Sequence, residues 1–183
     1  METSISPRHC LPPFRDLIPA VQPNNLSTVT ATSYREALPQ LSDHLFLTDA
    51  GLETTLIFHE GVELPYFAAF HLLKDAAGTE ILRRYFQRYA EMAASFGIGA
   101  VLESATWRAN PDWAARLGYD ARALAGANRK SIQLLEEVRA AAAPDHPMVI
   151  SGNLGPRGDG YRPEKRMTAG EARDYHAPQV AVF

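Results

Sequence analysis

The chain has very little cysteine. Among its 183 residues only Cys10 carries a thiol. No disulfide can form within the chain, and no metal site can be built from several of its own cysteines. Sparse cysteine is typical of proteins in a reducing compartment, so we expect a cytoplasmic location.

The chain also lacks long apolar runs and an excess of positive charge. No run approaches the roughly 20 residues that cross a bilayer, and prolines interrupt the apolar stretch near the N-terminus where a signal peptide needs an unbroken core. Lys and Arg number 18 against 21 Asp and Glu, for a net charge of −3. Nucleic acids and anionic membranes bind clustered positive charge. We therefore expect no nucleic-acid partner and no membrane partner.

Several common catalytic motifs are missing. The six histidines show no HExxH or other paired ligand spacing, and neither GxxxxGK[ST] nor GxSxG occurs. These absences count against a zincin, a P-loop nucleotide-binding protein and a serine hydrolase. What remains is a globular composition, with 46% hydrophobic and 21% charged residues, that can bury a sizeable core.

The sequence divides near residue 33. Residues 1–33 contain five prolines and a polar stretch without helical or strand periodicity, which predicts a disordered extension. Residues 34–183 carry regular patterns and form the predicted domain.

Three short apolar runs in this domain end in polar or glycine-containing segments. They are LFLTD (45–49), AVLES (100–104) and MVISG (148–152). Continuous apolar runs of this length are typical of parallel strands covered on both faces.

Helices are expected between and after these strands. Periodicity predicts one over 79–96, capped by Thr79 and ended by Gly97, and a long one after Asp120. A short helix should follow Asn110, and a capping box at Thr168 should begin another.

Alternating strands and helices indicate an α/β fold. The order alone permits an open doubly wound sheet or a closed barrel, and the polar ends of all three strands favour the barrel. The predicted fold class is therefore a partial (β/α)8 TIM barrel comprising about its first three βα units. Such a barrel needs eight strands, so we expect the sequence to be the N-terminal part of a longer protein.

The strand ends supply the candidate site residues. Asp49 could cap a helix or could hold a ligand ammonium group, with Gly51 allowing close approach of the backbone. Glu103 could pair with Arg108 or serve the same ligand. Trp107 could be an ordinary core aromatic or could wall a site for a sulfonium or amine through cation–π contact. The loop SGNLGPRGDGY (151–161) could be a structural turn or could bind a carboxylate or phosphate.

Taken together, these segments resemble a known family. LTDAGLETTLIFHEG, VLESATWRANPDWAARLGY, SGNLGPRGDGY and MTAGEARDYHAPQ, in this order, are similar to the N-terminal half of a homocysteine S-methyltransferase domain. The resemblance covers residues 34–183. It implies a (β/α)8 barrel that transfers a methyl group to the thiolate of homocysteine, giving methionine, from a donor such as S-methylmethionine, betaine or a folate.

The resemblance also implies roles for individual residues. The Asp-Gly-Gly segment that binds the amino-acid end of homocysteine in the family matches Asp49, Ala50 and Gly51, with Ala50 in place of the usual glycine. The second strand end of the family corresponds to Ser104-Ala105-Thr106-Trp107, and its third loop to the segment that contains Asn153 and Gly155. The implied substrate-binding set is Asp49, Ala50, Gly51, Glu103, Thr106, Trp107, Asn153 and Gly155.

The resemblance implies zinc as well, held in the family by three cysteines on later strands. Their positions lie beyond Phe183, so this sequence supplies none of them. Two alternatives to a methyltransferase stay open: a non-catalytic half-barrel fragment, and an unrelated α/β domain that binds a small molecule.

Overall fold

The computed structural model describes residues 37–142, 145–160 and 166–183. The predicted extension (1–33), Cys10 and Tyr161 lie outside the described residues, so the structure does not test the expectation of disorder there.

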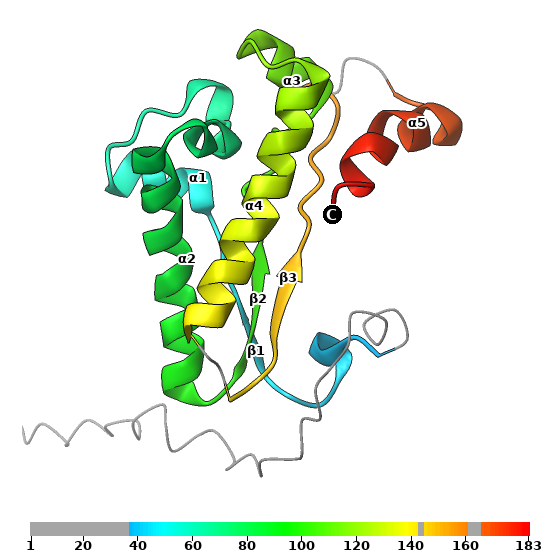
Figure 1. Ribbon diagram of the computed structural model, residues 1–183. Helices are drawn as coiled ribbons and strands as arrows, with labels where there is room; N and C mark the ends of the chain where they lie inside the picture. Colours follow the sequence, from blue (N-terminus) through cyan, green and yellow to red (C-terminus); the bar gives the residue numbers. More distant parts are fainter. Residues whose placement is uncertain (1–36, 143–144, 161–165) are drawn as a thin grey trace, which may run out of the picture.

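The centre of the fold is a sheet of three parallel strands (Figure 1). These are β1 (Phe46–Thr48), β2 (Gly99–Glu103) and β3 (Met148–Ser151), in the order β1-β2-β3. Leu47 is in register with Ala100, and Val101 with Val149. All three predicted strands are confirmed, and their parallel pairing places the three polar strand ends at one edge of the sheet.

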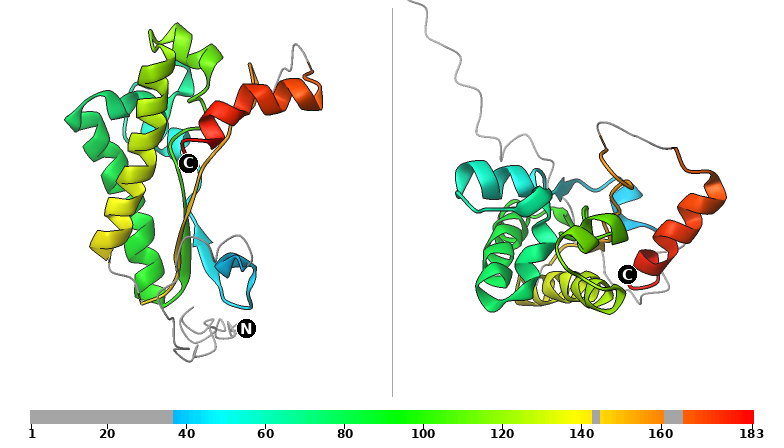
Figure 2. Two further views of the ribbon diagram at one scale, coloured as in Figure 1. Left: turned by 45° about the vertical axis from the view of Figure 1, so that its right-hand side comes forward. Right: turned by 90° about the horizontal axis from the view of Figure 1, so that it is seen from above.

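Two long helices cover one face of this sheet. They are α2 (Ala76–Phe96) and α4 (Ala121–Ala142), which pack against each other and against the strands (Figure 2). Between them and the sheet lies the core, whose fully buried side chains include Leu82, Phe86, Leu102 and Leu135. Burial of these apolar side chains stabilises the layer by roughly 2 kcal/mol each.

The helix ends agree with the sequence predictions at all but one position. Asp75, not Thr79, caps α2: its carboxylate accepts a hydrogen bond from the amide of Gly78 at 2.8 Å, because the helix begins one turn earlier than the apolar periodicity does. Gly97 ends α2 in the left-handed conformation, with φ of 65°.

Two further helices begin at the predicted caps. Asn110 caps α3 (Pro111–Arg116), and the predicted capping box at Thr168 begins α5 (Ala169–Val180).

Short helical segments follow β1. They comprise α1 (Leu52–Thr54), a π-helical turn (Thr55–His59) and two 3-10 helices (Pro65–Phe67 and Ala69–Lys74); a third 3-10 helix (Pro39–Leu41) precedes β1. Tyr66 and Phe67 both have positive φ, 57° and 56°, which is strained backbone for large side chains.

The observed class is α/β with a three-stranded parallel sheet. This matches the first βα units of the predicted barrel, although the described strands form an open sheet and do not by themselves close a barrel. Within the described ranges, no helix is both long enough and apolar enough to cross a bilayer.

Candidate functional site

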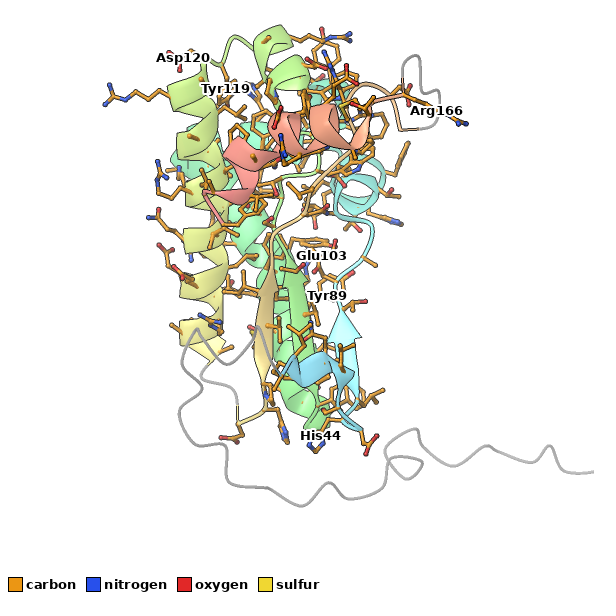
Figure 3. All side chains as sticks on the ribbon, turned by 90° about the vertical axis from the view of Figure 1, so that its right-hand side faces the viewer. His44, Tyr89, Glu103, Tyr119, Asp120 and Arg166 are labelled. Carbon is orange, nitrogen blue, oxygen red and sulfur yellow. The ribbon has the colours of Figure 1, made fainter. Side chains whose placement is uncertain are left out.

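Hydrogen bonds link the polar residues at the ends of the three strands. Asp49, just after β1, accepts a hydrogen bond from the Glu103 amide through its Oδ1 at 2.7 Å. Glu103, the last residue of β2, accepts one from the Asn153 side-chain amide at 3.1 Å. Figure 3 shows Glu103 at the end of the sheet opposite His44. The three loops thus bring Asp49, Glu103 and Asn153 together, as the sequence predicted for strand ends of a parallel sheet.

The carboxyl group of Asp49 is electrostatically unusual. Its pKa is raised from 3.8 to about 6, chiefly by burial and also by the nearby charges of Glu103 and Glu53, while the hydrogen bond from the Glu103 amide opposes the shift. Asp49 is not a helix cap, because the N-cap position of α1 belongs to Gly51. A half-buried carboxyl group beside a second carboxylate is a good receptor for a ligand cation, which would relieve their mutual repulsion.

The two residues after Asp49 form a fixed turn. The Ala50 carbonyl accepts hydrogen bonds from the hydroxyls of Tyr85 at 2.8 Å and Tyr89 at 3.2 Å, both on α2. Ala50 is exposed and is not among the residues with positive φ, so its Cβ is accommodated without backbone strain. Gly51 has φ of 64° and ψ of 39°, a conformation that favours glycine. The Asp49-Ala50-Gly51 turn therefore needs glycine at position 51 and not at position 50.

A closed ring of hydrogen bonds joins the second and third loops. The Asn153 amide donates to Ser104 Oγ at 2.9 Å, and Thr106 Oγ1 donates to the Asn153 carbonyl at 2.7 Å. Because the single hydroxyl proton of Thr106 is used there, the 2.6 Å contact between the two hydroxyls must be a donation from Ser104 to Thr106. Thr106 is completely buried. Its hydroxyl therefore positions Asn153 and is not exposed to a ligand.

Gly155 allows the same two loops to approach each other. A Cβ on Gly155 would lie 1.8 Å from the carbonyl oxygen of Trp107, a distance that no side chain can occupy. The glycine is therefore required for loop packing, and this packing carries Asn153 to Glu103.

A cavity of about 590 Å³ lies beside these loops. Its lining includes the predicted residue Trp107 together with Tyr66, Phe67 and Trp113, and the charged residues Glu53, Arg108 and Asp159. The pKa of Glu53 is raised overall, because the effect of burial is larger than the opposing effect of the Arg108 charge. Trp107 is half-buried and lines this cavity.

Arg108 has other contacts than the predicted one with Glu103. Its guanidinium stacks on the rings of Trp107 and Trp113 and donates through Nη1 to the Gly158 carbonyl at 2.9 Å. Glu103 instead accepts from Asn153. The strand-end carboxylates are thus linked to the third loop, and Arg108 belongs to the neighbouring cavity.

Sequence reasoning missed the polar side chains that support the loops from the helices. The Ser131 hydroxyl, on α4, accepts from the Ala105 amide at 3.0 Å. Gln179, on α5, donates to the Thr106 carbonyl at 3.2 Å and to the Asn128 side chain at 2.9 Å. Asn128 and Ser131 lie on the same face of α4 as Leu135 and Val138. Polar residues within that apolar stripe were the available signal.

The described residues contain no group of three or more His, Cys, Asp or Glu side chains that could hold a metal ion. The only cysteine of the chain is Cys10. The residues present therefore do not fit the three-cysteine zinc site that the resemblance implies.

Comparisons with known proteins agree with the fold and the strand-end segments. Two solved structures of the Escherichia coli homocysteine methyltransferase MmuM are similar to this chain. The metallated form has 23% sequence identity and a TM-score of 0.62, and the similarity covers 78% of this chain and 50% of that one. The oxidized form has 24% identity and a TM-score of 0.63, covering 81% and 51%. The chain therefore spans about half the length of these relatives.

Among curated proteins, no sequence matches this chain. The family model described as Homocysteine S-methyltransferase, however, matches residues 46–183, which include β1, β2, β3 and all the predicted site residues. The chain belongs to the homocysteine S-methyltransferase family.

Proposed function

We propose that the strand-end site of this chain binds the amino-acid end of homocysteine, as part of a (β/α)8 enzyme that methylates the homocysteine thiolate to give methionine. The observation that carries the proposal is the hydrogen-bonded series from Asp49 through Glu103 to Asn153, located within the segment that matches the family. The single cysteine supports a cytoplasmic setting for such an enzyme.

Asp49 and Glu103 are the proposed receptors of the substrate ammonium group. With a pKa of about 6, Asp49 is mostly ionised at neutral pH, so two carboxylates face one binding position. A cation between them gains attraction to both and removes their repulsion. The Asn153 side chain fixes the orientation of Glu103, and the Ser104–Thr106–Asn153 ring holds Asn153 in place. The ammonium group is thus recognised by charges that are already positioned.

The methyl donor is proposed to occupy the cavity lined by Trp107, Tyr66 and Phe67. This cavity adjoins the strand-end loops, and aromatic faces attract onium groups such as a sulfonium or a quaternary ammonium. We propose S-methylmethionine, betaine or a similar molecule as the donor. Zinc belongs to this proposal through the family, but the residues described do not fit it, and no step of binding at Asp49 depends on it.

Calorimetric titration with two ligands tests the proposal. Homocysteine carries the ammonium group, and 4-mercaptobutyrate is the same molecule without it. We expect homocysteine to bind at least about tenfold more tightly, and we expect Glu103→Gln to reduce this preference. Glu91→Gln, a change on the exposed side of α2, is the matched control. Equal affinity for the two ligands would show that the strand-end carboxylates do not receive the ammonium group.

A further inference from the structure

Two tyrosines of α2 contact the backbone turn that follows Asp49. Tyr85 and Tyr89 lie one helical turn apart, so their side chains leave α2 on the same face. The Tyr85 hydroxyl donates to the Ala50 carbonyl at 2.8 Å, and the Tyr89 hydroxyl donates to the same oxygen at 3.2 Å. Because a carbonyl oxygen has two lone pairs, both acceptor positions of Ala50 are occupied by hydroxyl groups of α2.

The packing of the tyrosine rings fixes the positions of these hydroxyl groups. Tyr85 is 1% exposed, and its ring centroid lies 5.1 Å from that of Tyr89 and 5.2 Å from that of Phe86. A buried ring packed against two other rings has few alternative rotamers. Burial, together with the neighbouring Tyr89 and Asp49, raises the pKa of Tyr85, so its hydroxyl keeps the proton that it donates. The direction of these donors is therefore set by α2 and not by the turn.

The turn depends on these donors because its own residues constrain it little. Ala50 is exposed, so burial of its side chain does not fix it, and Gly51 can adopt several backbone conformations. Before the turn, the Asp49 amide donates to the Val101 carbonyl at 3.3 Å; after it, the Gly51 carbonyl accepts from the Thr55 amide at 2.8 Å. The Ala50 carbonyl lies between these two backbone contacts, and the tyrosine hydroxyls hold it there.

The position of the Asp49 carboxyl group follows from the conformation of the turn. Asp49 Oδ1 accepts from the Glu103 amide at 2.7 Å, a contact that requires the Asp49 backbone to keep its present direction. That direction is set on one side by the sheet and on the other by the Ala50 peptide. Groups that recognise a ligand must be held within about 0.5 Å of the binding geometry. Release of the Ala50 peptide would therefore let the Asp49 carboxyl group leave its place beside Glu103.

We propose that Tyr85 and Tyr89 are positioning residues of the strand-end site: by fixing the Ala50 carbonyl, they hold the Asp49 carboxyl group where it receives the substrate ammonium group. They act through the turn and do not touch the substrate. Such preorganisation increases affinity, because the turn is ordered before the ligand binds. The inference rests on the proposed function for the identity of the ligand, and it adds the residues that hold its receptor in place.

Backbone amide relaxation of the full chain without ligand tests this positioning. We expect the Gly51 amide of the wild type to have an order parameter of about 0.85, the value of rigid backbone. The double variant Tyr85→Phe/Tyr89→Phe keeps both rings and removes both hydroxyls, and its Gly51 value should fall to about 0.6 or below. Tyr119→Phe is the matched control. It removes one partly buried hydroxyl, which contacts His71 Nδ1 at 3.1 Å and not the turn, so Gly51 should stay rigid.

Calorimetric titration of the same variants with homocysteine and 4-mercaptobutyrate connects position to recognition. We expect the double variant to bind homocysteine at least about fivefold more weakly than the wild type, and 4-mercaptobutyrate within about twofold of it. A purely structural loss would weaken both ligands alike, so a change in their ratio is specific to the ammonium receptor. Tyr119→Phe should keep the wild-type ratio. Thermal melts check that each variant is folded.

The wild type alone can overturn the inference, whatever the stability of the variants: a flexible Gly51 amide in the free chain would show that the tyrosines do not hold the turn. The inference is also wrong if the folded double variant keeps a rigid Gly51 amide or the wild-type ratio of the two ligands. Failure of the proposed function is a separate result. The wild type would then bind both ligands equally, although its Gly51 amide is rigid and becomes mobile in the double variant.

Discussion

Lowering the pH from 7 to 5 should weaken homocysteine binding about tenfold through one group, the carboxyl of Asp49. Its pKa of about 6 leaves it mostly ionised at pH 7. If only the ionised form holds the substrate ammonium, affinity follows the ionised fraction, which falls from roughly nine-tenths at pH 7 to roughly one-tenth at pH 5. With the ordinary pKa of 3.8, the same change in pH would alter the affinity by less than about one-tenth.

The environment of Asp49 accounts for the size of this effect. Burial is the largest cause of the raised pKa, and the acidic neighbours Glu103 and Glu53 act in the same direction. Tyr85 also lies within electrostatic range, but burial raises its pKa even further from neutrality, so it does not titrate between pH 5 and 7. The amino, carboxyl and thiol groups of homocysteine likewise titrate outside this interval. Asp49, whose pKa of about 6 lies in the middle of this interval, therefore changes charge there, and the Asp49→Asn variant separates its contribution from that of Glu53, whose pKa burial also raises.

Calorimetric titration under reducing conditions at pH 5, 6 and 7 measures the effect. The control is Asp49→Asn, which keeps an oxygen to accept the Glu103 amide but carries no charge. This variant should bind weakly and with little dependence on pH. Wild-type affinity that is constant between pH 5 and 7, or a dependence that persists in Asp49→Asn, would refute the assignment of the ammonium to Asp49.

Three other predictions concern stability and metal content. Thr106→Val should destabilise the chain by about 1–3 kcal/mol in urea unfolding, because the Ser104 hydroxyl and the Asn153 carbonyl lose buried partners, whereas Thr54→Val at an exposed position should have little effect. Gly155→Ala should lower the free energy of unfolding by at least about 2 kcal/mol, because the new Cβ clashes with the Trp107 carbonyl. Its control is Gly126→Ala inside α4, where the Cβ has open space and should stabilise the chain by about 0.5–1 kcal/mol. A Gly155→Ala variant as stable as the wild type would contradict the observed loop packing. The purified chain by itself should hold much less than one equivalent of zinc by mass spectrometry and should not methylate homocysteine. Stoichiometric zinc would contradict the conclusion that the residues present do not fit a three-cysteine zinc site.

The raised pKa of Asp49 also has a consequence for folding. A carboxyl group whose pKa is higher in the native state binds more protons there than in the unfolded state, so its contribution to stability falls as the pH rises from about 4 to 6. Asp49→Asn should therefore be more stable than the wild type at pH 8, by about 1 kcal/mol after allowance for solvent screening, and should lose this advantage near pH 4. Thermal melting at both pH values measures the difference, and an advantage that does not change with pH would contradict the shift.

The strands and the site loops were predictable because their signals are local. Each apolar run ended in polar or glycine-containing residues, and parallel pairing necessarily brings such ends to one edge. Helix caps such as Asn110 and Thr168 were equally local, since the side chain and the amides it caps lie within three residues. Asp75 was missed because α2 begins with Ala76-Ala77-Gly78, which shows no apolar periodicity.

The contacts across loops were not predictable in the same way. The sequence suggested Arg108 as a partner of Glu103, but the distance between two side chains five residues apart depends on how the turn after β2 runs. That turn directs Arg108 between two tryptophans and leaves Glu103 beside Asn153, 50 residues further along the chain. Likewise, the tyrosines of α2 resemble ordinary core residues in sequence, and only the fold reveals that their hydroxyls hold Ala50.

The most direct test of the central claim is a two-dimensional amide NMR spectrum of the chain titrated with homocysteine. The account predicts that the largest shifts fall on three separate segments, 49–51, 103–107 and 153–155, and that they saturate together with one dissociation constant. The absence of saturable shifts, or shifts confined to residues away from the strand ends, would contradict the assignment of this edge of the sheet as the homocysteine site.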